Sequence, residues 1–174
     1  MTDLFEQPSQ KLDAATTEIQ HAIAPGLANK QRLFGTMRQL YGEGSADGAW
    51  CQRDAFDLLE AALTRHMAGL LDKPQMLTRI SEINALIEAL PTHTVRSEDQ
   101  IRYQQFSTPA DLAALCVILA QPLATDIVLE PSAGHGALVA TLPSVSALHL
   151  NEIDPRRREK LALLFPQATI TGID

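Results

Sequence analysis

Three short apolar runs alternate with two helical segments from residue 126 onward. The runs have the length and composition of buried strands, whereas the segments between them show the apolar spacing of helices. Strands joined through helices pair in parallel, because such crossovers are right-handed. We therefore expect an α/β fold with an open parallel sheet of about three strands. The predicted strands are DIVLE (126–130), ALHLNE (147–152) and ATITGID (168–174), and the predicted helices are GALVATL (136–142) and PRRREKLALLF (155–165).

Upstream of this region, apolar residues recur at helical spacing from about residue 9 to residue 91. They form four stripes, which predicts a helical bundle over residues 1–91. Residues 92–108 are polar and carry charges of both signs, as a linker would. A further helix is expected to start at Pro109, with Thr108 as its N-cap. The candidate core residues of the four stripes are Leu12, Ala15, Ile19, Ala22, Ile23, Leu33, Phe34, Met37, Leu40, Tyr41, Phe56, Leu59, Leu63, His66, Met67, Leu70, Met76, Ile80, Ile83, Ile87 and Leu90.

The composition excludes several classes of protein. The formal net charge of −7 argues against nonspecific binding of nucleic acid by this chain alone. No apolar run is long enough to cross a membrane and no signal peptide opens the chain, so we expect a cytoplasmic protein without membrane contact. Cys51 and Cys116 form no C-x-x-C pair, which predicts reduced, buried thiols and no metal site.

The segment LEPSAGHGAL (129–138) follows the first predicted strand directly. In an open parallel sheet, ligands bind beyond the carboxyl ends of the strands. Gly134 and Gly136 lack a Cβ, so they permit positive φ angles and let a ligand lie against the backbone. The helix expected after them would offer free N–H groups to that ligand. This turn is therefore the candidate ligand site.

Acidic residues near the strand ends indicate the kind of ligand. Glu130, Glu152 and Asp174 end the three predicted strands. A carboxylate repels a pyrophosphate but attracts a cation. The third glycine of a dinucleotide fingerprint is replaced by Val139, and no Gly-Lys-Ser/Thr follows, so NAD and a P-loop nucleotide are disfavoured. S-adenosylmethionine, which carries a sulfonium, an ammonium and no phosphate, fits this pattern best.

Three motifs in sequence resemble those of a known family. QQFSTP (104–109), LEPSAGHG (129–136) and NEIDP (151–155) are similar to successive motifs of amino-methylating DNA methyltransferases, especially N6-adenine methylases. The chain resembles in particular the methylase domains attached to strawberry-notch-type helicases and to phage antirestriction proteins. The resemblance covers residues 92–174. It implies that residues 109–174 are the first part of a Rossmann-like class I methyltransferase sheet that binds S-adenosylmethionine, with 92–108 as linker and cofactor wall.

The resemblance also assigns roles to individual positions. It makes residues 106–109 the wall at the methionine end of the cofactor, and it places Glu152 at the ribose. His135 fills a position that varies within the motif, and we expect its side chain to face solvent. The predicted cofactor-binding residues are Phe106, Ser107, Thr108, Pro109, Glu130, Ala133, Gly134, Gly136, Glu152, Ile153 (against one face of the adenine) and Asp174 (at the adenine amino group).

The motif that holds the target base in these methylases is absent from these residues. That motif is an Asn/Asp/Ser-Pro-Pro-aromatic tetrapeptide, which orients the extruded adenine, and the sequence contains no Pro-Pro. We therefore expect no catalytic residue in this chain and no methyl transfer by it alone. The chain is interpreted as the amino-terminal, cofactor-binding portion of a longer DNA adenine methyltransferase.

Two alternatives to this interpretation stay open at this point. The same motifs serve methyltransferases that act on protein glutamine or on RNA. A non-catalytic module is a second alternative, in which the helical bundle docks a protein partner beside a remnant cofactor fold. The basic run Arg156–Arg158 has two readings as well, a solvated helix start or a phosphate contact to DNA in the complete protein.

Overall fold

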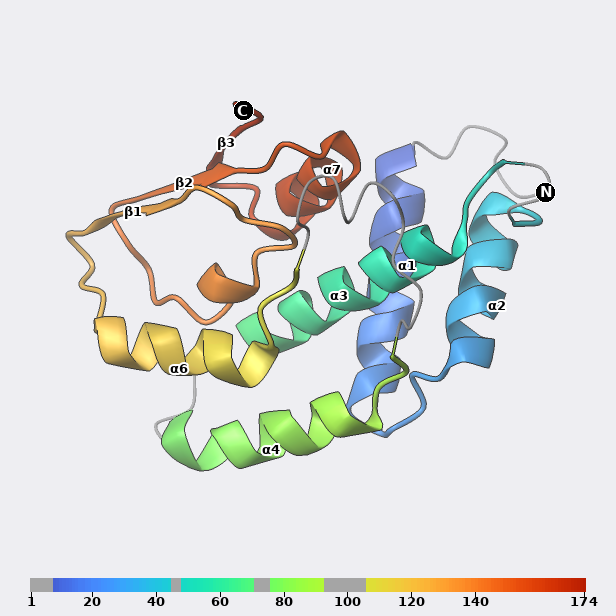
Figure 1. The fold of residues 1–174 in the computed structure, drawn as a ribbon, viewed down its shortest axis with the longest axis horizontal. Helices are drawn as coiled ribbons and strands as arrows, with labels where there is room; N and C mark the ends of the chain where they lie inside the picture. The colour runs from blue at the N-terminus through green and yellow to red at the C-terminus, as the bar shows by residue number, and fades with distance from the viewer. Residues whose placement is uncertain (1–7, 45–47, 71–75, 93–105) are drawn as a thin grey trace.

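The structure is a computed structural model that describes residues 8–44, 48–70, 76–92 and 106–174. In these residues, five helices precede a three-stranded parallel sheet with one further helix, so the predicted mixed α/β fold is confirmed (Figure 1). The helices before the sheet are α1 (Pro8–Ile23), α2 (Lys30–Tyr41), α3 (Gln52–Ala68), α4 (Met76–Ala89) and α6 (Ala110–Ala120). The elements after them are β1 (Ile127–Glu130), the 3-10 turn η1 (Ala137–Val139), β2 (Ala147–Asn151), α7 (Pro155–Leu164) and β3 (Thr169–Thr171).

The sheet has the strand order β1-β2-β3 and is not closed. Both strand pairs are parallel, and Leu129, His149 and Thr169 are in register across the three strands. One face of the sheet packs on α7, where Leu150 and Leu161 are fully buried. On the other face, the side chains of Ile127 and Leu129 are exposed.

Local side-chain contacts explain where several helices begin. Asn29 caps α2 by accepting a hydrogen bond from the Arg32 amide at 2.9 Å. Asp154 caps α7 in the same way at the Arg156 amide, and Pro155 provides the fixed φ that suits the first helical position. Such caps satisfy amides that have no partner within their own helix.

Three expectations about these elements are corrected. Pro109, not Thr108, is the N-cap of α6, because its backbone is extended (φ −52°, ψ 137°) and helical geometry starts at Ala110. The helix expected over residues 136–142 is only the short turn η1. Strand β3 ends at Thr171, so Asp174 lies three residues beyond the strand.

The helices α1, α2 and α3 enclose the largest hydrophobic cluster. Ile19, Ile23, Leu33 and Leu58 are almost completely inaccessible to solvent there. The ring of Trp50 joins the edge of this cluster and donates a hydrogen bond from Nε1 to the Gly42 carbonyl at 2.9 Å. The apolar stripes of α1, α2 and the first part of α3 therefore meet in one core.

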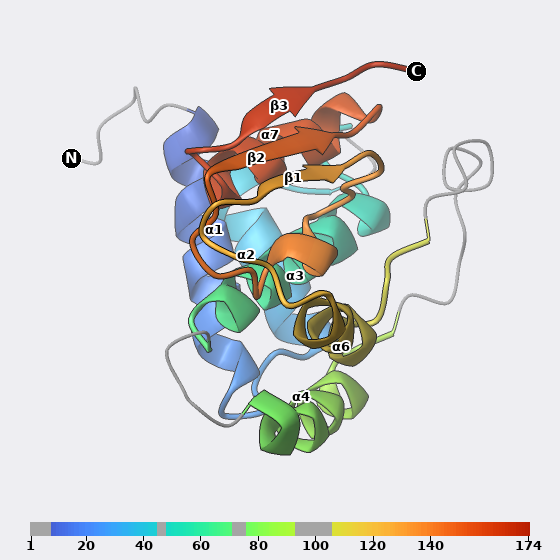
Figure 2. The ribbon, with the colours of Figure 1, turned by 90° about the vertical axis from the view of Figure 1, so that its left-hand side faces the viewer.

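The helical segment and the sheet segment are in direct contact. A second hydrophobic cluster joins Met67 of α3 and Ile83 of α4 to Ala110 and Ala114 of α6. Helix α3 also packs against α7. In Figure 2 the strands lie at one end of the molecule and α4 at the other, with α3 and α6 between them. The domain boundaries at residues 91 and 108 stay a prediction, and residues 93–105 of the expected linker lie outside the described residues.

Two further expectations concern membrane contact and the burial of the two cysteines. None of the helices in the described ranges is both long and apolar enough to cross a membrane. Both cysteines are free thiols, but the prediction that they are buried is wrong: Cys116 is exposed and Cys51 is half-buried. Cys116 lies on the outer side of α6, whose buried positions are Ala110, Ala113, Ala114 and Val117.

Candidate functional site

A cavity of about 800 Å³ lies at the carboxyl ends of β1 and β2. Its walls are the glycine turn, the segment 106–110, the residues after β3 and one side of α3. Nine of the eleven predicted cofactor-binding residues line it, although they come from four separate stretches of sequence. The nine are Phe106, Ser107, Thr108, Pro109, Ala133, Gly134, Glu152, Ile153 and Asp174. Glu130 and Gly136 are not among the lining residues.

The glycine turn has the backbone that its sequence predicts. Gly134 and Gly136 have φ angles of +55° and +83°, which residues with a Cβ rarely adopt. At Gly136, an added Cβ would also lie 2.8 Å from Cζ of Phe165, the residue that follows α7. Gly136 therefore lets the turn pack closely on α7. Its absence from the cavity wall is explained by this packing.

Glu130 and Glu152 both hold this turn in place. Glu152 is buried, and its Oε2 accepts a hydrogen bond from the Gly134 amide at 2.8 Å. Its Oε1 accepts from the Asp154 amide, also at 2.8 Å, so one carboxylate braces the turns after β1 and β2. Glu130 Oε1 accepts from the Ser132 amide at 2.9 Å. Each carboxylate oxygen can accept more than one hydrogen bond, so Glu152 retains capacity for a ligand.

Asn151 ties the same region to the residues that follow β3. Its Nδ2 donates to the carbonyls of Pro131 at 3.2 Å and Ile173 at 2.9 Å. Its Oδ1 accepts from the Thr171 hydroxyl at 2.7 Å and from the Ile173 amide at 2.9 Å. One amide side chain therefore positions the glycine turn and the approach to Asp174 together, a role that the sequence analysis missed.

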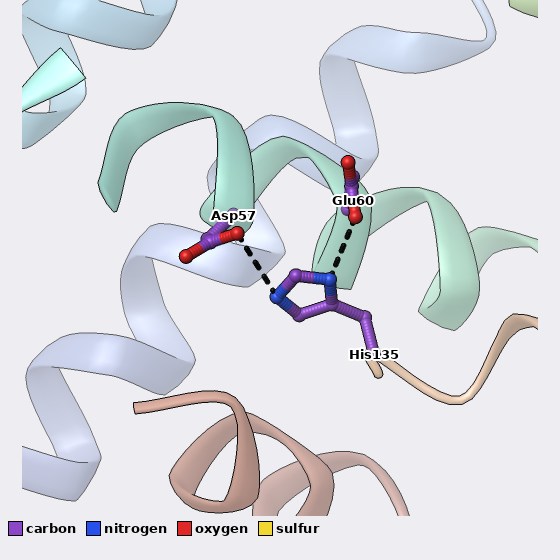
Figure 3. Close-up of side chains that lie close together, drawn as sticks. All are labelled: Asp57, Glu60 and His135. Carbon is purple, nitrogen blue, oxygen red and sulfur yellow. Dashed lines mark hydrogen bonds and ion pairs between the residues drawn. The ribbon is translucent and has the colours of Figure 1, made fainter. Parts of the chain in front are cut away.

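His135 does not face solvent, and the prediction that it does is wrong. Its side chain is buried between Asp57 and Glu60, which lie three residues apart on α3 (Figure 3). Nδ1 is 2.7 Å from Glu60 Oε2, and Nε2 is 3.5 Å from Asp57 Oδ1. The positive φ angles on both sides of His135 allow the turn to direct this ring toward the helix.

Glu60 connects two of the predicted cofactor segments. Its Oε2 accepts hydrogen bonds from His135, in the glycine turn, and from the Ser107 hydroxyl. Burial opposes ionisation of this carboxyl, but the hydrogen bonds and charge of His135, the Ser107 hydroxyl and the charge of Arg157 outweigh it and lower the pKa of Glu60 to about 2. Glu60 is therefore a carboxylate at neutral pH, in the wall of the cavity.

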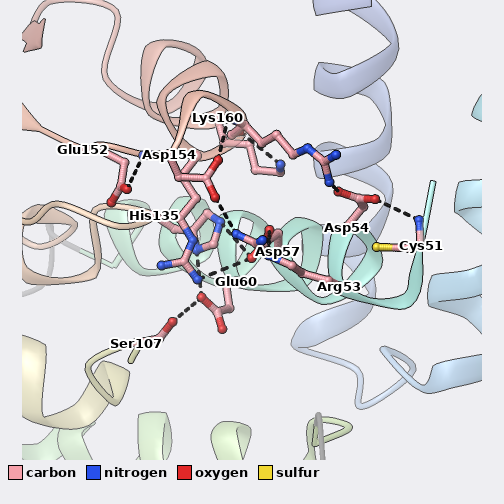
Figure 4. A network of polar contacts seen from close by, with 12 residues as sticks. Cys51, Arg53, Asp54, Asp57, Glu60, Ser107, His135, Glu152, Asp154 and Lys160 are labelled. Atoms are coloured by element: carbon pink, nitrogen blue, oxygen red, sulfur yellow. Dashed lines mark hydrogen bonds and ion pairs between the residues drawn. The ribbon is translucent and has the colours of Figure 1, made fainter. Parts of the chain in front are cut away.

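Buried charges continue from α3 into α7 (Figure 4). Arg53 of α3 pairs with Asp154, the cap of α7, and its Nε lies 3.6 Å from Asp57 Oδ2. Arg157 Nη2 lies 3.5 Å from the other oxygen of Asp57. These four side chains are all at least nine-tenths buried. Removing one partner of such a buried ion pair strongly destabilises the fold, because the remaining charge is left uncompensated.

Asp57, Glu60 and His135 bring three potential metal ligands within 4.8 Å of one another. The two carboxylates, however, face different nitrogens of the imidazole, and one ion cannot bind both nitrogens. Arg53 and Arg157 also lie beside Asp57 and oppose a cation there. The arrangement favours an ion-pair network over a metal centre.

The three side chains of the basic run Arg156–Arg158 lie in different surroundings. Arg156 is exposed and pairs with Asp54 at 3.0 Å. Arg157 is buried in the wall of the cavity. Arg158 Nη1 donates to the carbonyls of Glu152 and Ile153, each at 2.7 Å. The reading of this run as a solvated helix start fits Arg156 but not the other two arginines, whose guanidinium groups support the fold.

Comparison with known proteins found no matching family model, no matching curated protein and no matching solved structure. The class of the protein is therefore defined by its own features. It is a mixed α/β protein with a cavity at the carboxyl edge of an open parallel sheet, and a helix from the amino-terminal segment supplies one wall.

Proposed function

We propose that this chain binds S-adenosylmethionine in the cavity at the carboxyl ends of β1 and β2. The observation that carries the proposal is the convergence of nine predicted cofactor residues on one cavity. They come from the segments 106–109, 133–134, 152–153 and 174. If the resemblance were accidental, these segments would not be expected to meet in one cavity. The location also agrees with the general rule for ligands of open α/β sheets.

The charge of the cavity supports a cationic ligand. Glu60, Glu152 and Asp174 line it, and Arg157 is the positively charged lining residue of the described part of the chain. An excess of carboxylates attracts the sulfonium and ammonium groups of S-adenosylmethionine and repels the pyrophosphate of NAD. Ile153 lies in the same wall, where it would contact a face of the adenine.

The reaction that this cofactor would serve is methyl transfer. We propose an exocyclic amino group of adenine in DNA as the acceptor, acting through the complete protein, because the three motifs occur in the order of N6-adenine methylases. The residues of this chain would bind and orient the cofactor. Within them, Glu152 and Asn151 would keep the cavity open by fixing the turns around it.

Titration calorimetry with the 174-residue chain tests the binding proposal. We expect saturable binding of S-adenosylmethionine and S-adenosylhomocysteine and no heat with NAD. An Ile153→Ala variant should bind S-adenosylhomocysteine about tenfold more weakly, a loss of about 1.4 kcal/mol, because it loses apolar contact with the ligand. Ile127→Ala, at an exposed position of β1, is the matched control and should bind as the unmodified chain does. A folded chain that binds neither sulfur ligand would refute the proposal.

A further inference from the structure

Two oppositely charged side chains line the cavity without belonging to any of the predicted cofactor residues. Glu60 comes from α3 and Arg157 from α7. They lie near the glycine turn: Glu60 contacts His135, and a Cβ added to Gly134 would be 3.9 Å from Nη1 of Arg157. A ligand that lies against this turn would therefore meet a negative and a positive group together.

Glu60 has an oxygen available for such a ligand. Both of its hydrogen bonds, from His135 and from Ser107, reach Oε2. Within the described residues no partner is recorded for Oε1, and the side chain is 38% exposed. A carboxylate oxygen in this position can accept a charge-assisted hydrogen bond from an ammonium group.

The guanidinium of Arg157, in turn, lacks a full set of hydrogen-bond acceptors in the described part of the chain. Its side chain is only 4% exposed, and its one ion pair in the described ranges is the 3.5 Å contact with Asp57. Its Nε has no hydrogen-bond partner there. A buried guanidinium with unmade hydrogen bonds costs free energy. A carboxylate would supply acceptors to two of its donors at once, which is the geometry that arginine favours.

We propose that Glu60 and Arg157 recognise an α-amino acid group, with the ammonium at Glu60 and the carboxylate at Arg157. The inference rests on the proposed function and extends it, since it identifies the residues that would hold the amino-acid end of S-adenosylmethionine. The helical segment then contributes directly to ligand recognition through α3. Adenine ligands without an amino-acid group gain nothing from this pair.

Two adenine thioethers separate the contribution of the pair from that of the rest of the cavity. S-adenosylhomocysteine carries the amino-acid group, and 5′-methylthioadenosine has the same nucleoside and thioether without it. We expect Glu60→Gln and Arg157→Lys to weaken S-adenosylhomocysteine at least tenfold and to change the Kd of methylthioadenosine less than twofold. Glu88→Gln and Arg156→Lys, at exposed positions of α4 and α7, should leave both Kd values unchanged.

A comparison of ligands tests the same proposal first on the unmodified chain. A thioether with an aminopropyl chain, which keeps the ammonium and lacks the carboxylate, should bind to the unmodified chain more weakly than S-adenosylhomocysteine. The difference should disappear in Arg157→Lys. The comparison on the unmodified chain tests the role of the guanidinium even if a variant is poorly folded. Thermal unfolding would reveal such a variant.

The outcomes distinguish this inference from the function it rests on. If the unmodified chain binds neither thioether, both proposals are overturned. If it binds both thioethers with equal affinity, or if the variants weaken both equally, S-adenosyl binding stands and the assignment of Glu60 and Arg157 is overturned. A selective loss of S-adenosylhomocysteine binding supports the assignment.

Discussion

His135 Nδ1 lies 2.7 Å from Glu60 Oε2, although the two residues are 75 positions apart in the sequence. The contact joins the glycine turn, which carries the clearest ligand motif, to the middle of α3. Ser107 reaches the same carboxylate oxygen from the segment before α6. The cavity is consequently built around one acidic side chain that belongs to none of the motifs.

The first prediction concerns the pH dependence of stability. The pKa of Glu60 is about 2 in the folded chain against an ordinary value of 4.5, so folding favours its ionised form. Its contribution is complete above about pH 4.5 and is lost as the pH falls toward 2. Glu60→Gln should therefore lose stability less steeply than the unmodified chain over this interval, as urea midpoints at a series of pH values would show. Glu88→Gln should keep the original slope, and equal slopes for Glu60→Gln would contradict the prediction.

The second prediction separates two requirements for glycine. Gly136→Ala places a Cβ at φ +83° and 2.8 Å from Cζ of Phe165, so we expect a loss of about 2–4 kcal/mol in the free energy of unfolding. Gly26→Ala, at φ +70° with no heavy atom within 4 Å of the added Cβ, should lose only about 1 kcal/mol. Chemical denaturation of both variants measures the difference. Equal losses would show that Phe165 moves aside without cost.

The third prediction concerns Asn151. Asn151→Ala removes four hydrogen bonds that hold the Pro131 carbonyl and the residues around Ile173. The Ile173 amide should then exchange its hydrogen faster, because its acceptor is the lost side chain. Hydrogen exchange resolved to single amides is the measurement. Asn84→Ala, at an exposed position of α4, should leave the exchange unchanged.

The fourth prediction tests how strongly the helical and sheet segments are coupled. Arg53→Met removes the buried cation that pairs with Asp154 and lies 3.6 Å from Asp57, so it should cost about 3–5 kcal/mol. Arg38→Met removes an exposed ion pair with Glu43 and should cost less than about 1 kcal/mol. Helix and sheet signals should shift together in Arg53→Met. Two separate transitions would mean that the segments unfold independently.

The fifth prediction concerns Glu152. Glu152→Gln replaces one acceptor oxygen by a donor, so the amides of Gly134 and Asp154 can no longer both be satisfied by this side chain. S-adenosylhomocysteine should bind more weakly by about 1–3 kcal/mol, the scale of hydrogen bonds to a charged acceptor. Calorimetry measures the loss. Unchanged affinity, with the fold intact, would remove Glu152 from the site.

The order of the elements could be predicted because local signals determine it. The stripes that contain Ile19 and Ile23 lead to buried positions in α1, and the strands start within about one residue of their predicted positions. The parallel pairing follows from the helix between β2 and β3 and from the long connection before β2. These features require no knowledge of distant contacts.

The partners of His135 could not be predicted in the same way. A turn residue between two glycines carries no periodic signal, and its acidic partners belong to a helix whose sequence reads as ordinary core and surface. The available clue was on α3 itself. Arg53, Asp57 and Glu60 follow one another at helical spacing beside the apolar stripe, which indicates a charged face next to the core. What that face meets depends on tertiary packing alone.

The contact between Arg53 and Asp154, 101 residues apart, has a consequence for the order of assembly. During synthesis, α1, α2 and α3 emerge first and can collapse on their own apolar stripes, because their contacts are local. At that stage Arg53 and Asp57 have each other, but Asp154 and Arg157 have not yet left the ribosome. The polar side of α3 therefore stays hydrated until those residues follow, and the cavity can form only after α7 has been synthesised.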